Sequence, residues 1–479
     1  MTVIHAAQPR FELDGAADAL LLERCGRAVA RARRTGRPVI AAVTVPVDAD
    51  IDASAVVLAS RRAGEPWLCF EQPDREGAAL AALGSVYRIS GSGPGRFKAV
   101  ARGWRDVLAE AHADAPDGPP GSGLVAVGGF AFADGGGASP PWGGFQQAGL
   151  DVPAIAFARR GRDVRLTVAV AAGPGDDPEA LVGGIQDRLA GLREAALPLI
   201  DPAPAGRFRI ASAAPPEHYE AAVARAVSEI RAGEYDKVVL AREVLVQAPS
   251  AHDAAAVFGV LRSSFDSCYV FCAGRGDAAL VGASPELLVR RTGLRAQTVA
   301  LAGSTRRSAD PGVDAHLAER LLHSAKDLQE HAIVTRQISR ALRPHSLWVA
   351  APDEPVIIKV ANIQHLATPI RAQLIRPVSV VELAGCLHPT PAVGGAPHAE
   401  ATRRIPELES LDRGWYAGPV GWTDANEDGE FCVALRCALL RGDEARLYAG
   451  VGVVADSDPA AELAETEDKL AALLPVLSG

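Results

Sequence analysis

Hydrophobic and polar positions in the first half of the chain change between a helical and a strand-like period. Apolar residues recur at helical spacing over residues 17–35, 98–112 and 178–196, which predicts three helices. VIAAVTVPV, WLCFEQPD and the glycine-containing GSGLVAVGGFAFA (121–133) are apolar runs typical of strands. The alternating runs of IAFARRGRDVRLTVAVA predict a hairpin that turns at residues 160–163.

The second half combines long helices with many short strands. A helix over PPEHYEAAVARAVSEIRAG should end at Gly233 and lead into the strand that begins EYDKVVLARE. Further strands are predicted at 268–274, 279–283 and 286–291, followed by one long helix over about 312–343. The chain should close with two strands joined by a turn (WYAGPVGWTDANEDGEFCVALRCALL), another strand (ARLYAGVGVVA) and a helix from Pro459.

This order of elements contains little regular strand–helix–strand alternation. It predicts an α+β fold in which large, mainly antiparallel β-sheets pack face to face, with helices on the outside. The proline-rich PLIDPAPAG (198–206) is typical of a linker. We therefore expect an N-terminal part, residues 1–206, that packs on a C-terminal part, residues 207–479.

Composition narrows the possible partners and the compartment. The 479 residues are 48% hydrophobic, which is enough for a large core, and the net charge of −9 argues against nucleic acid or anionic membrane as a partner. The seven cysteines are scattered without a CxxC pair, which fits a reduced cytoplasm. The opening MTVIHAAQPRFELDG has no signal-peptide layout, and no 18-residue apolar span occurs. We expect a cytoplasmic protein.

Lys237 is unusual because it opens an apolar strand. Alternate side chains of a strand point to opposite faces, so Lys237 shares a face with Val239 and Ala241. Strands often begin with a solvated charge, and the pattern alone leaves this interpretation open beside that of a buried, functional amine.

Two helices carry acidic residues on one face. Asp327 and Glu330 are three residues apart in KDLQEHAIV. Glu462, Glu465 and Lys469 share a face in ELAETEDKL. Each set alone is typical of a solvated helix surface. If the two faces met, the crowded carboxylates would need a hard cation, and a site of few carboxylates with room for water and ligand suits Mg²⁺.

Two stretches match familiar ligand-binding motifs, but the sequence around each does not fit the corresponding site. DANEDG (424–429) opens like a calcium loop, but Leu435 stands where the bidentate glutamate belongs, and a strand follows instead of a helix. GVGVVA (450–455) matches a dinucleotide fingerprint, but the strand continues through it. The helix start signal is Asp458 followed by Pro459, which is too late for a nucleotide site. The first motif is therefore a hairpin turn, and the glycines of the second suggest a ligand close to the backbone.

Ten stretches, in this order, resemble the chorismate-utilising enzymes, and among them most closely the isochorismate synthases. The resemblance is strong over residues 215–475, and FEQPDR and GGFAFA extend it weakly toward the N-terminus. The stretches are KVVLAR (237–242), GASPELL (282–288), LAGSTRR (301–307), KDLQEHAIV (326–334), IQHLATPI (363–370), LHPTPAVGGAP (387–397), RGWYAGPVGW (413–422), FCVALRCALL (431–440), YAGVGVV (448–454) and AETEDKL (464–470).

The resemblance implies a chorismate-binding fold with residues 207–479 as its catalytic domain, and a role for each matching position. Lys237 matches the general base that activates water to attack C2 of chorismate, and Glu286 the general acid that protonates the departing C4 hydroxyl. Glu330 and Glu465 match the Mg²⁺ carboxylates, with Asp327 and Glu462 as outer positions. The positions that match substrate contacts are Gly303, Ser304, His365, Tyr416, Arg436, Gly450, Gly452 and Lys469.

These roles agree with elementary chemistry. Water is a poor nucleophile and hydroxide a poor leaving group, so the exchange needs a base and an acid. Burial favours a neutral lysine, which can accept a proton, and a protonated glutamic acid, which can donate one. Arg436, Lys469 and Mg²⁺ would supply the positive charge that a dianionic substrate requires.

The resemblance implies Mg²⁺-dependent isomerisation of chorismate to isochorismate. The lysine at position 237 argues for water as nucleophile, because anthranilate synthase subunits, which use ammonia, lack it. The alternatives are a salicylate synthase, which adds pyruvate elimination at the same site, and a silent chorismate-binding subunit. A downstream isochorismatase or lyase is the implied partner, in a menaquinone or siderophore pathway, and the protein could be a monomer or a homodimer.

Overall fold

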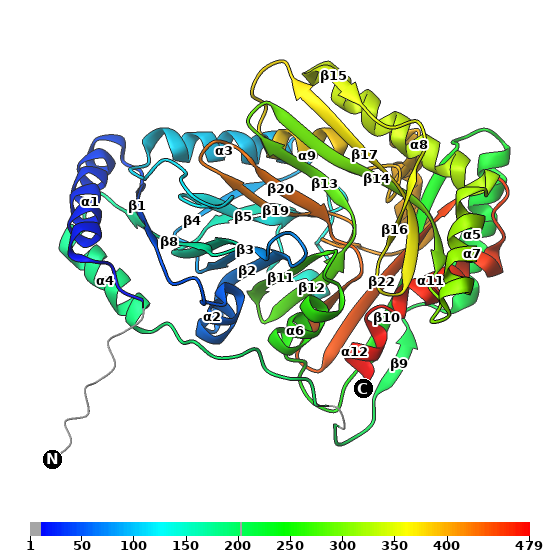
Figure 1. Ribbon diagram of the computed structural model, residues 1–479, viewed down its shortest axis with the longest axis horizontal. Coiled ribbons are helices and arrows are strands. Elements are labelled where there is room, and N and C mark those ends of the chain that lie inside the picture. The colour runs from blue at the N-terminus through cyan, green and yellow to red at the C-terminus, as the bar shows by residue number, and fades with distance from the viewer. Residues whose placement is uncertain (1–10, 202–203) are drawn as a thin grey trace.

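Two large antiparallel sheets organise the computed structural model, which describes residues 11–201 and 204–479 (Figure 1). Over these residues the first sheet has twelve strands, and β9 (Arg209–Ser212) pairs with β10 outside the main order. That order is β1 (Val39–Pro46), β8 (Asp163–Ala172), β7 (Ile155–Arg160), β3 (Ala78–Leu83), β2 (Gly64–Gln72), β11 (Tyr269–Gly276), β12 (Ala278–Ser284), β21 (Cys437–Arg441), β22 (Glu444–Val453), β10 (Lys237–Gln247) and β18 (Gly395–Ala396).

The second sheet has ten strands over the same described residues, with β16 (Val356–Lys359) paired to β17 outside the main order. That order is β15 (Ser346–Ala350), β17 (Ile363–Leu374), β14 (Arg295–Arg306), β13 (Leu287–Thr292), β20 (Gly429–Val433), β19 (Pro419–Asp424), β5 (Val125–Phe130), β6 (Ala148–Val152) and β4 (Tyr87–Gly91). Each sheet combines strands from before and after residue 206, and the division of the chain at that residue stays a prediction.

The sheets face each other across a shared core, and helices cover their outer faces (Figure 1). Phe70 and Leu280 of the first sheet belong to the same buried cluster as Phe130 and Phe431 of the second. The α+β class with antiparallel sheets and outer helices is therefore confirmed. The helices are α1 (Gly15–Thr35), α2 (Ala53–Ser60), α3 (Arg96–Glu110), α4 (Pro178–Ala190), α5 (Pro216–Arg231), α6 (Ala254–Ser264), α7 (Pro311–Leu322), α8 (Ala325–Leu342), α9 (Val380–Leu387), α10 (His398–Glu409), α11 (Pro459–Leu470) and α12 (Leu474–Ser478), with short 3₁₀ turns η1 (Pro140–Trp142) and η2 (Arg343–His345).

Local sequence explains most element boundaries. Helix α1 begins where the Asp14 side chain accepts a hydrogen bond from the backbone N–H of Ala17, and it ends at Gly36 in the left-handed conformation. The predicted 155–171 hairpin is confirmed by pairing of Arg160 with Asp163 at its turn. Helix α4 is shorter than predicted, because Gly191 ends it at Ala190.

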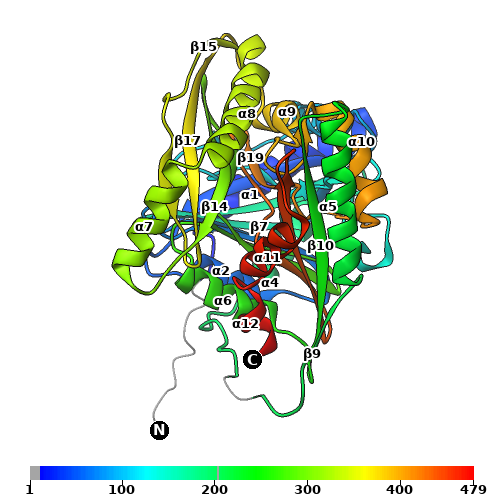
Figure 2. The ribbon, with the colours of Figure 1, turned by 90° about the vertical axis from the view of Figure 1, so that its right-hand side faces the viewer.

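One predicted helix is two helices. The expected single helix over 312–343 is wrong, since α7 ends at Leu322 and α8 begins at Ala325. Ser324 causes the break, because its side chain accepts the N–H of Asp327 and caps a new helix. The new helix α8 carries Asp327 and Glu330 and packs against β14 and β17 (Figure 2).

One predicted strand is also two strands, and they lie in different sheets. FCVALRCALL is interrupted after Val433, so that β20 belongs to the second sheet and β21 to the first. Arg436 adopts a left-handed backbone conformation, with φ of 46°, at this crossing. The expectation of one continuous strand is therefore wrong, and the crossing exposes Leu435 and Arg436 to the space between the sheets.

Both rejected motifs have the structures expected from their context. DANEDG forms the turn between β19 and β20, with Thr423 paired to Gly429. Strand β22 runs to Val453, and α11 begins at Pro459 behind the cap of Asp458. The linker stretch 198–206 has no regular element where it is described, and its residues 202–203, like residues 1–10, lie outside the described part. Throughout the described chain, each helix is too short or too polar to span a bilayer.

Candidate active site

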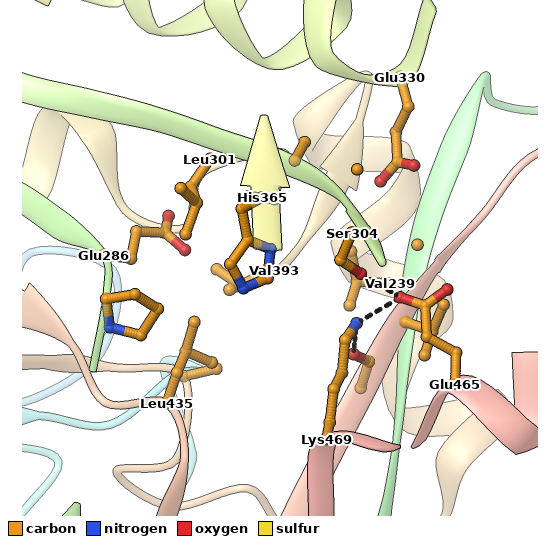
Figure 3. A pocket seen from close by; sticks show the side chains of 18 of the residues that line it. Val239, Glu286, Leu301, Ser304, Glu330, His365, Val393, Leu435, Glu465 and Lys469 are labelled. Carbon is orange, nitrogen blue, oxygen red and sulfur yellow. Dashed lines mark hydrogen bonds and ion pairs between the residues drawn. The ribbon is translucent and has the colours of Figure 1, made fainter. Parts of the chain in front are cut away.

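A pocket with about 780 Å³ of empty space, mouth included, lies between the two sheets where α8 and α11 meet β22 (Figure 3). In this view Glu286 stands on one side, Glu465 and Lys469 stand on the other, and His365 is seen between them. The sequence-predicted site residues that line it are Glu286, Gly303, Ser304, Asp327, Glu330, His365, Tyr416, Arg436, Gly450, Gly452, Glu462, Glu465 and Lys469.

Lys237, the remaining predicted site residue, lies just behind the pocket wall. Its side chain is completely buried, so the interpretation of a solvated charge is wrong. Its Nζ atom lies 2.8 Å from Oε1 of Glu330, which lines the pocket. Gly452, on the neighbouring strand β22, leaves room for this pair, because a Cβ there would lie 2.6 Å from Glu330 Oε1 and 2.7 Å from Lys237 Cε.

Glu286 occupies the point where the chain crosses from the first sheet to the second, between β12 and β13. Its backbone is held at both ends, because its N–H donates to Ser284 Oγ and its carbonyl accepts from the N–H of Val433. The carboxyl is buried and accepts one hydrogen bond, at 3.3 Å, from the Thr390 hydroxyl. Burial raises the pKa of Glu286 to about 7, although Thr390, Lys237 and Arg436 oppose the shift.

The two acidic helix faces meet in this pocket. Asp327 and Glu330 come from α8, and Glu462 and Glu465 come from α11, so the condition that the sequence left open is fulfilled. Lysines and serines neutralise or hydrogen-bond the carboxylates. The contacts are Lys326 Nζ to Glu462 Oε1 at 3.1 Å, Lys469 Nζ to Glu465 Oε1 at 2.8 Å, Ser304 Oγ to Glu465 Oε1 at 2.9 Å, and Ser324 Oγ to Asp327.

The carboxylates differ in their electrostatic surroundings. Burial, with repulsion from nearby carboxylates, raises the pKa of Asp327 and of Glu462. The pKa of Glu465 is lowered instead, because the Lys469 ammonium, the Ser304 hydroxyl and the charge of Lys326 together outweigh the effect of burial. Among the described residues no three His, Cys, Asp or Glu side chains are arranged closely enough to hold a metal ion together. As arranged, Glu330, Glu462 and Glu465 each pair with a lysine ammonium group, and Asp327 is hydrogen-bonded to Ser324.

A cationic and aromatic wall completes the pocket opposite the helices. Arg436 Nη2 lies 3.4 Å from His365 Nε2, and the buried Nε of Arg436 has no hydrogen-bond partner within the described chain. Burial, followed by the charges of Arg436 and Lys469, lowers the pKa of His365 well below its usual value, so the imidazole is neutral. Tyr416 is buried beside Gly450, where an added Cβ would lie 3.1 Å from the tyrosine hydroxyl.

Glycines bring the backbone close to this space at two more points. Gly303 has a φ of 76° at a bulge in the β14–β17 pairing, and a Cβ there would lie 3.1 Å from Asp327 Cβ. Lys469 Nζ donates to the Gly450 carbonyl at 2.9 Å as well as contacting Glu465. The glycines of the rejected nucleotide motif therefore line a ligand-sized pocket.

Sequence reasoning missed three polar residues around this pocket. Lys326 pairs with Glu462, Thr390 bonds Glu286, and the buried Arg413 lines the wall beside Tyr416. Each lies inside a stretch that carried the resemblance, in KDLQEHAIV, LHPTPAVGGAP and RGWYAGPVGW respectively. Their roles depend on contacts between segments far apart in sequence, which spacing along the chain does not reveal.

Known proteins are similar to this chain over most of its length. A protein named salicylate biosynthesis isochorismate synthase, from Pseudomonas aeruginosa, is 39% identical over 454 residues, which cover 94% of this chain and 93% of the relative. Isochorismate synthase MenF of Bacillus subtilis is 36% identical over 74% of this chain and 75% of its own.

Solved structures give the same result. The menaquinone-specific isochorismate synthase MenF of Escherichia coli superimposes with a TM-score of 0.76 at 26% identity, over 96% of this chain and 99% of that one. A structure titled as the putative isochorismate synthase DhbC of Bacillus anthracis gives a TM-score of 0.69 at 29% identity, over 88% and 99%. The profile of the chorismate binding enzyme family matches residues 27–478, and the chain belongs to this family.

Proposed function

We propose that this protein is an isochorismate synthase that isomerises chorismate by adding water at C2 and expelling the C4 hydroxyl. One observation carries the proposal: a buried lysine and a buried glutamic acid flank the same pocket, in positions suited to a base and an acid. Relatives that span nearly the whole chain bear the name of this activity.

Lys237 is the proposed base. Its amine is completely buried and lies 2.8 Å from the Glu330 carboxylate, which can balance the charge that the amine gains when it takes a proton. A water held in the pocket beside Gly452 would give a proton to the Lys237 amine as it attacks C2 of chorismate. The tight packing of Gly452 against the lysine fixes the direction of the amine.

Glu286 is the proposed acid, and Figure 3 shows it across the pocket from Glu330, the ion-pair partner of Lys237. A pKa of about 7 keeps a large fraction of this carboxyl protonated at neutral pH, which an acid needs. The Thr390 hydroxyl would orient the carboxyl, since it donates to one oxygen and leaves the other free to hold the proton.

The cationic wall would bind the two carboxylates of the substrate. Arg436 presents an unpartnered Nε, and Lys469 reaches the same pocket from α11. The neutral imidazole of His365 can donate a hydrogen bond without adding charge.

Mg²⁺ is part of the proposal, and the donor set fits it. Four carboxylates from two helices line one pocket, and Mg²⁺ commonly uses only one or two carboxylates together with water and substrate oxygens. Glu330 and Glu465 would hold the ion, with Asp327 and Glu462 behind them. When bound, Mg²⁺ would supply positive charge for the ring carboxylate of chorismate. In the described structure Lys237 and Lys469 balance the charges of Glu330 and Glu465, the two carboxylates that would hold the ion.

The test is incubation of the purified protein with chorismate and Mg²⁺, followed by chromatographic separation of the products. The proposal expects isochorismate at an equilibrium ratio, and the same ratio when isochorismate is the starting material. Salicylate and pyruvate formed by the pure protein would instead show a salicylate synthase. Unchanged chorismate would show a binding protein without this activity.

A further inference from the structure

The strand that carries Lys237 has an incomplete neighbour on one side. Strand β10 pairs with β22 along its length. On its other edge β18 pairs only with Lys237 and Val238, and the pairing with β9 starts at Val244. Residues 239–243 therefore have no neighbouring strand there. Backbone groups buried at such an edge need other partners.

A buried ion pair fills part of this gap. Glu409 Oε1 accepts the N–H of Ala241 at 2.6 Å, and Arg413 Nη2 donates to the carbonyl of Val239 at 2.8 Å. Glu409 and Arg413 are themselves paired, with side-chain exposures of 1% and 3%. These side chains take the place of a strand, two residues from Lys237.

The same arginine also holds the loop that positions the acid. Arg413 Nη1 donates to the carbonyl of Val393 at 2.9 Å, in the 388–394 loop, and Thr390 of this loop donates to Glu286. The loop is tied to the strand directly as well, since Val239 N–H donates to Gly394 O. The guanidinium also lies 4.2 Å from the centroid of the Phe132 ring, which restricts its plane.

We infer that the Glu409–Arg413 pair is a positioning device, which fixes the strand of the base Lys237 relative to the loop that orients the acid Glu286. This inference rests on the proposed function. The guanidinium of Arg413 bonds Val239, Val393 and Glu409, so it is occupied by protein groups and serves geometry rather than substrate charge. A lysine has one ammonium and cannot reproduce the planar fork.

The experiment compares Arg413→Lys and Glu409→Gln with Glu65→Gln. The control breaks the part-buried pair of Arg188 and Glu65, which joins α4 to β2 away from the pocket. Each variant is measured for thermal unfolding and for kcat and KM with chorismate and Mg²⁺. Glu409→Gln retains an oxygen that can accept from Ala241 and is the milder variant if Arg413→Lys fails to fold.

We expect kcat to fall by about 10- to 100-fold in both positioning variants, because small misplacements of a base and acid have effects of this size. KM should change by less than about threefold, and kcat of the control should stay within about twofold at a comparable loss of thermal stability. A kcat loss no larger than that of the control, or a loss confined to KM, would overturn the inference. Failure of the proposed function is distinguishable, because it appears as a wild-type protein that forms no isochorismate.

Discussion

Replacing Glu286 with glutamine should stabilise the protein at alkaline pH while removing its activity. The folded protein holds the Glu286 proton up to about pH 7, whereas the unfolded chain releases it near 4.5. Between these values the folded state binds more protons than the unfolded state, so stability falls as pH rises through this window. The glutamine has no proton to lose and should lack this part of the slope.

The pKa of the buried Glu286 carboxyl sets how much the free energy of unfolding changes with pH. A change from 4.5 to about 7, at 1.36 kcal/mol per pKa unit, corresponds to about 3 kcal/mol when the whole window is crossed. Most of this window lies between pH 5 and pH 8, so the stability difference between variant and wild type should grow by about 2–3 kcal/mol over that range.

The assay is urea unfolding of wild type and Glu286→Gln at both pH values, with turnover of chorismate measured alongside. Turnover should fall by about 10²–10⁴-fold, because the acid is lost. A stability difference that is the same at both pH values would refute the reasoning. Thr390→Val is a useful companion variant, because it removes a hydrogen bond that lowers the pKa of Glu286. With the pKa higher, Glu286 should stay protonated to higher pH, and the loss of activity on the alkaline side should begin at a higher pH than in the wild type.

Three further predictions concern the base and the metal. Lys237→Ala should reduce kcat by about 10²–10⁴-fold at neutral pH with chorismate affinity largely kept, and near-normal turnover would contradict its role. EDTA should abolish turnover and Mg²⁺ restore it, while Glu330→Gln or Glu465→Gln should raise the Mg²⁺ concentration needed; activity indifferent to EDTA would show that the carboxylates serve only the lysines. Gly452→Ala should lower kcat by more than tenfold, because the new methyl group displaces Lys237 and Glu330; Gly26→Ala, with open space around its Cβ position, should leave kcat unchanged.

Much of the fold could be predicted because it follows from local patterns. The signal of Asp458 followed by Pro459 marks a helix start directly in the sequence, and the structure begins α11 there. The two wrong elements have different causes. The break at Ser324 is local, because its hydroxyl caps α8 by accepting the N–H of Asp327, and hydrophobic periodicity does not record such a cap. The change of sheet near Arg436 depends on tertiary strand pairing, which a continuous apolar run hides.

The sequence predicts which residues form the candidate site better than it predicts how their charges are paired. Spacing placed Asp327 with Glu330 and Glu462 with Glu465, and the structure joins the two pairs in one pocket. Spacing also placed Lys469 on the face of Glu465, but it could not show that Lys326 of α8 pairs with Glu462 of α11 or that Lys237 pairs with Glu330, because these ion pairs join segments far apart in the sequence.

The position of the acid follows from the way that the two sheets are connected. The chain crosses between the sheets at Glu286 and again at residues 434–436, and the N–H of Val433 bonds the Glu286 carbonyl where the crossings meet. A side chain at a crossing lies between two packed sheets, where water is excluded, and this burial is the main cause of its raised pKa. Lys237 is buried by another route, at the start of β10, where Gly452 of β22 packs against its side chain and the Glu409–Arg413 pair holds the residues that follow it. The acid thus depends on sheet connectivity and the base on its strand edge, and Arg413 joins the two through Val239 and Val393. Substitutions in the Glu409–Arg413 pair should therefore disturb the base and the acid together, whereas substitutions at the crossing should act mainly on the acid.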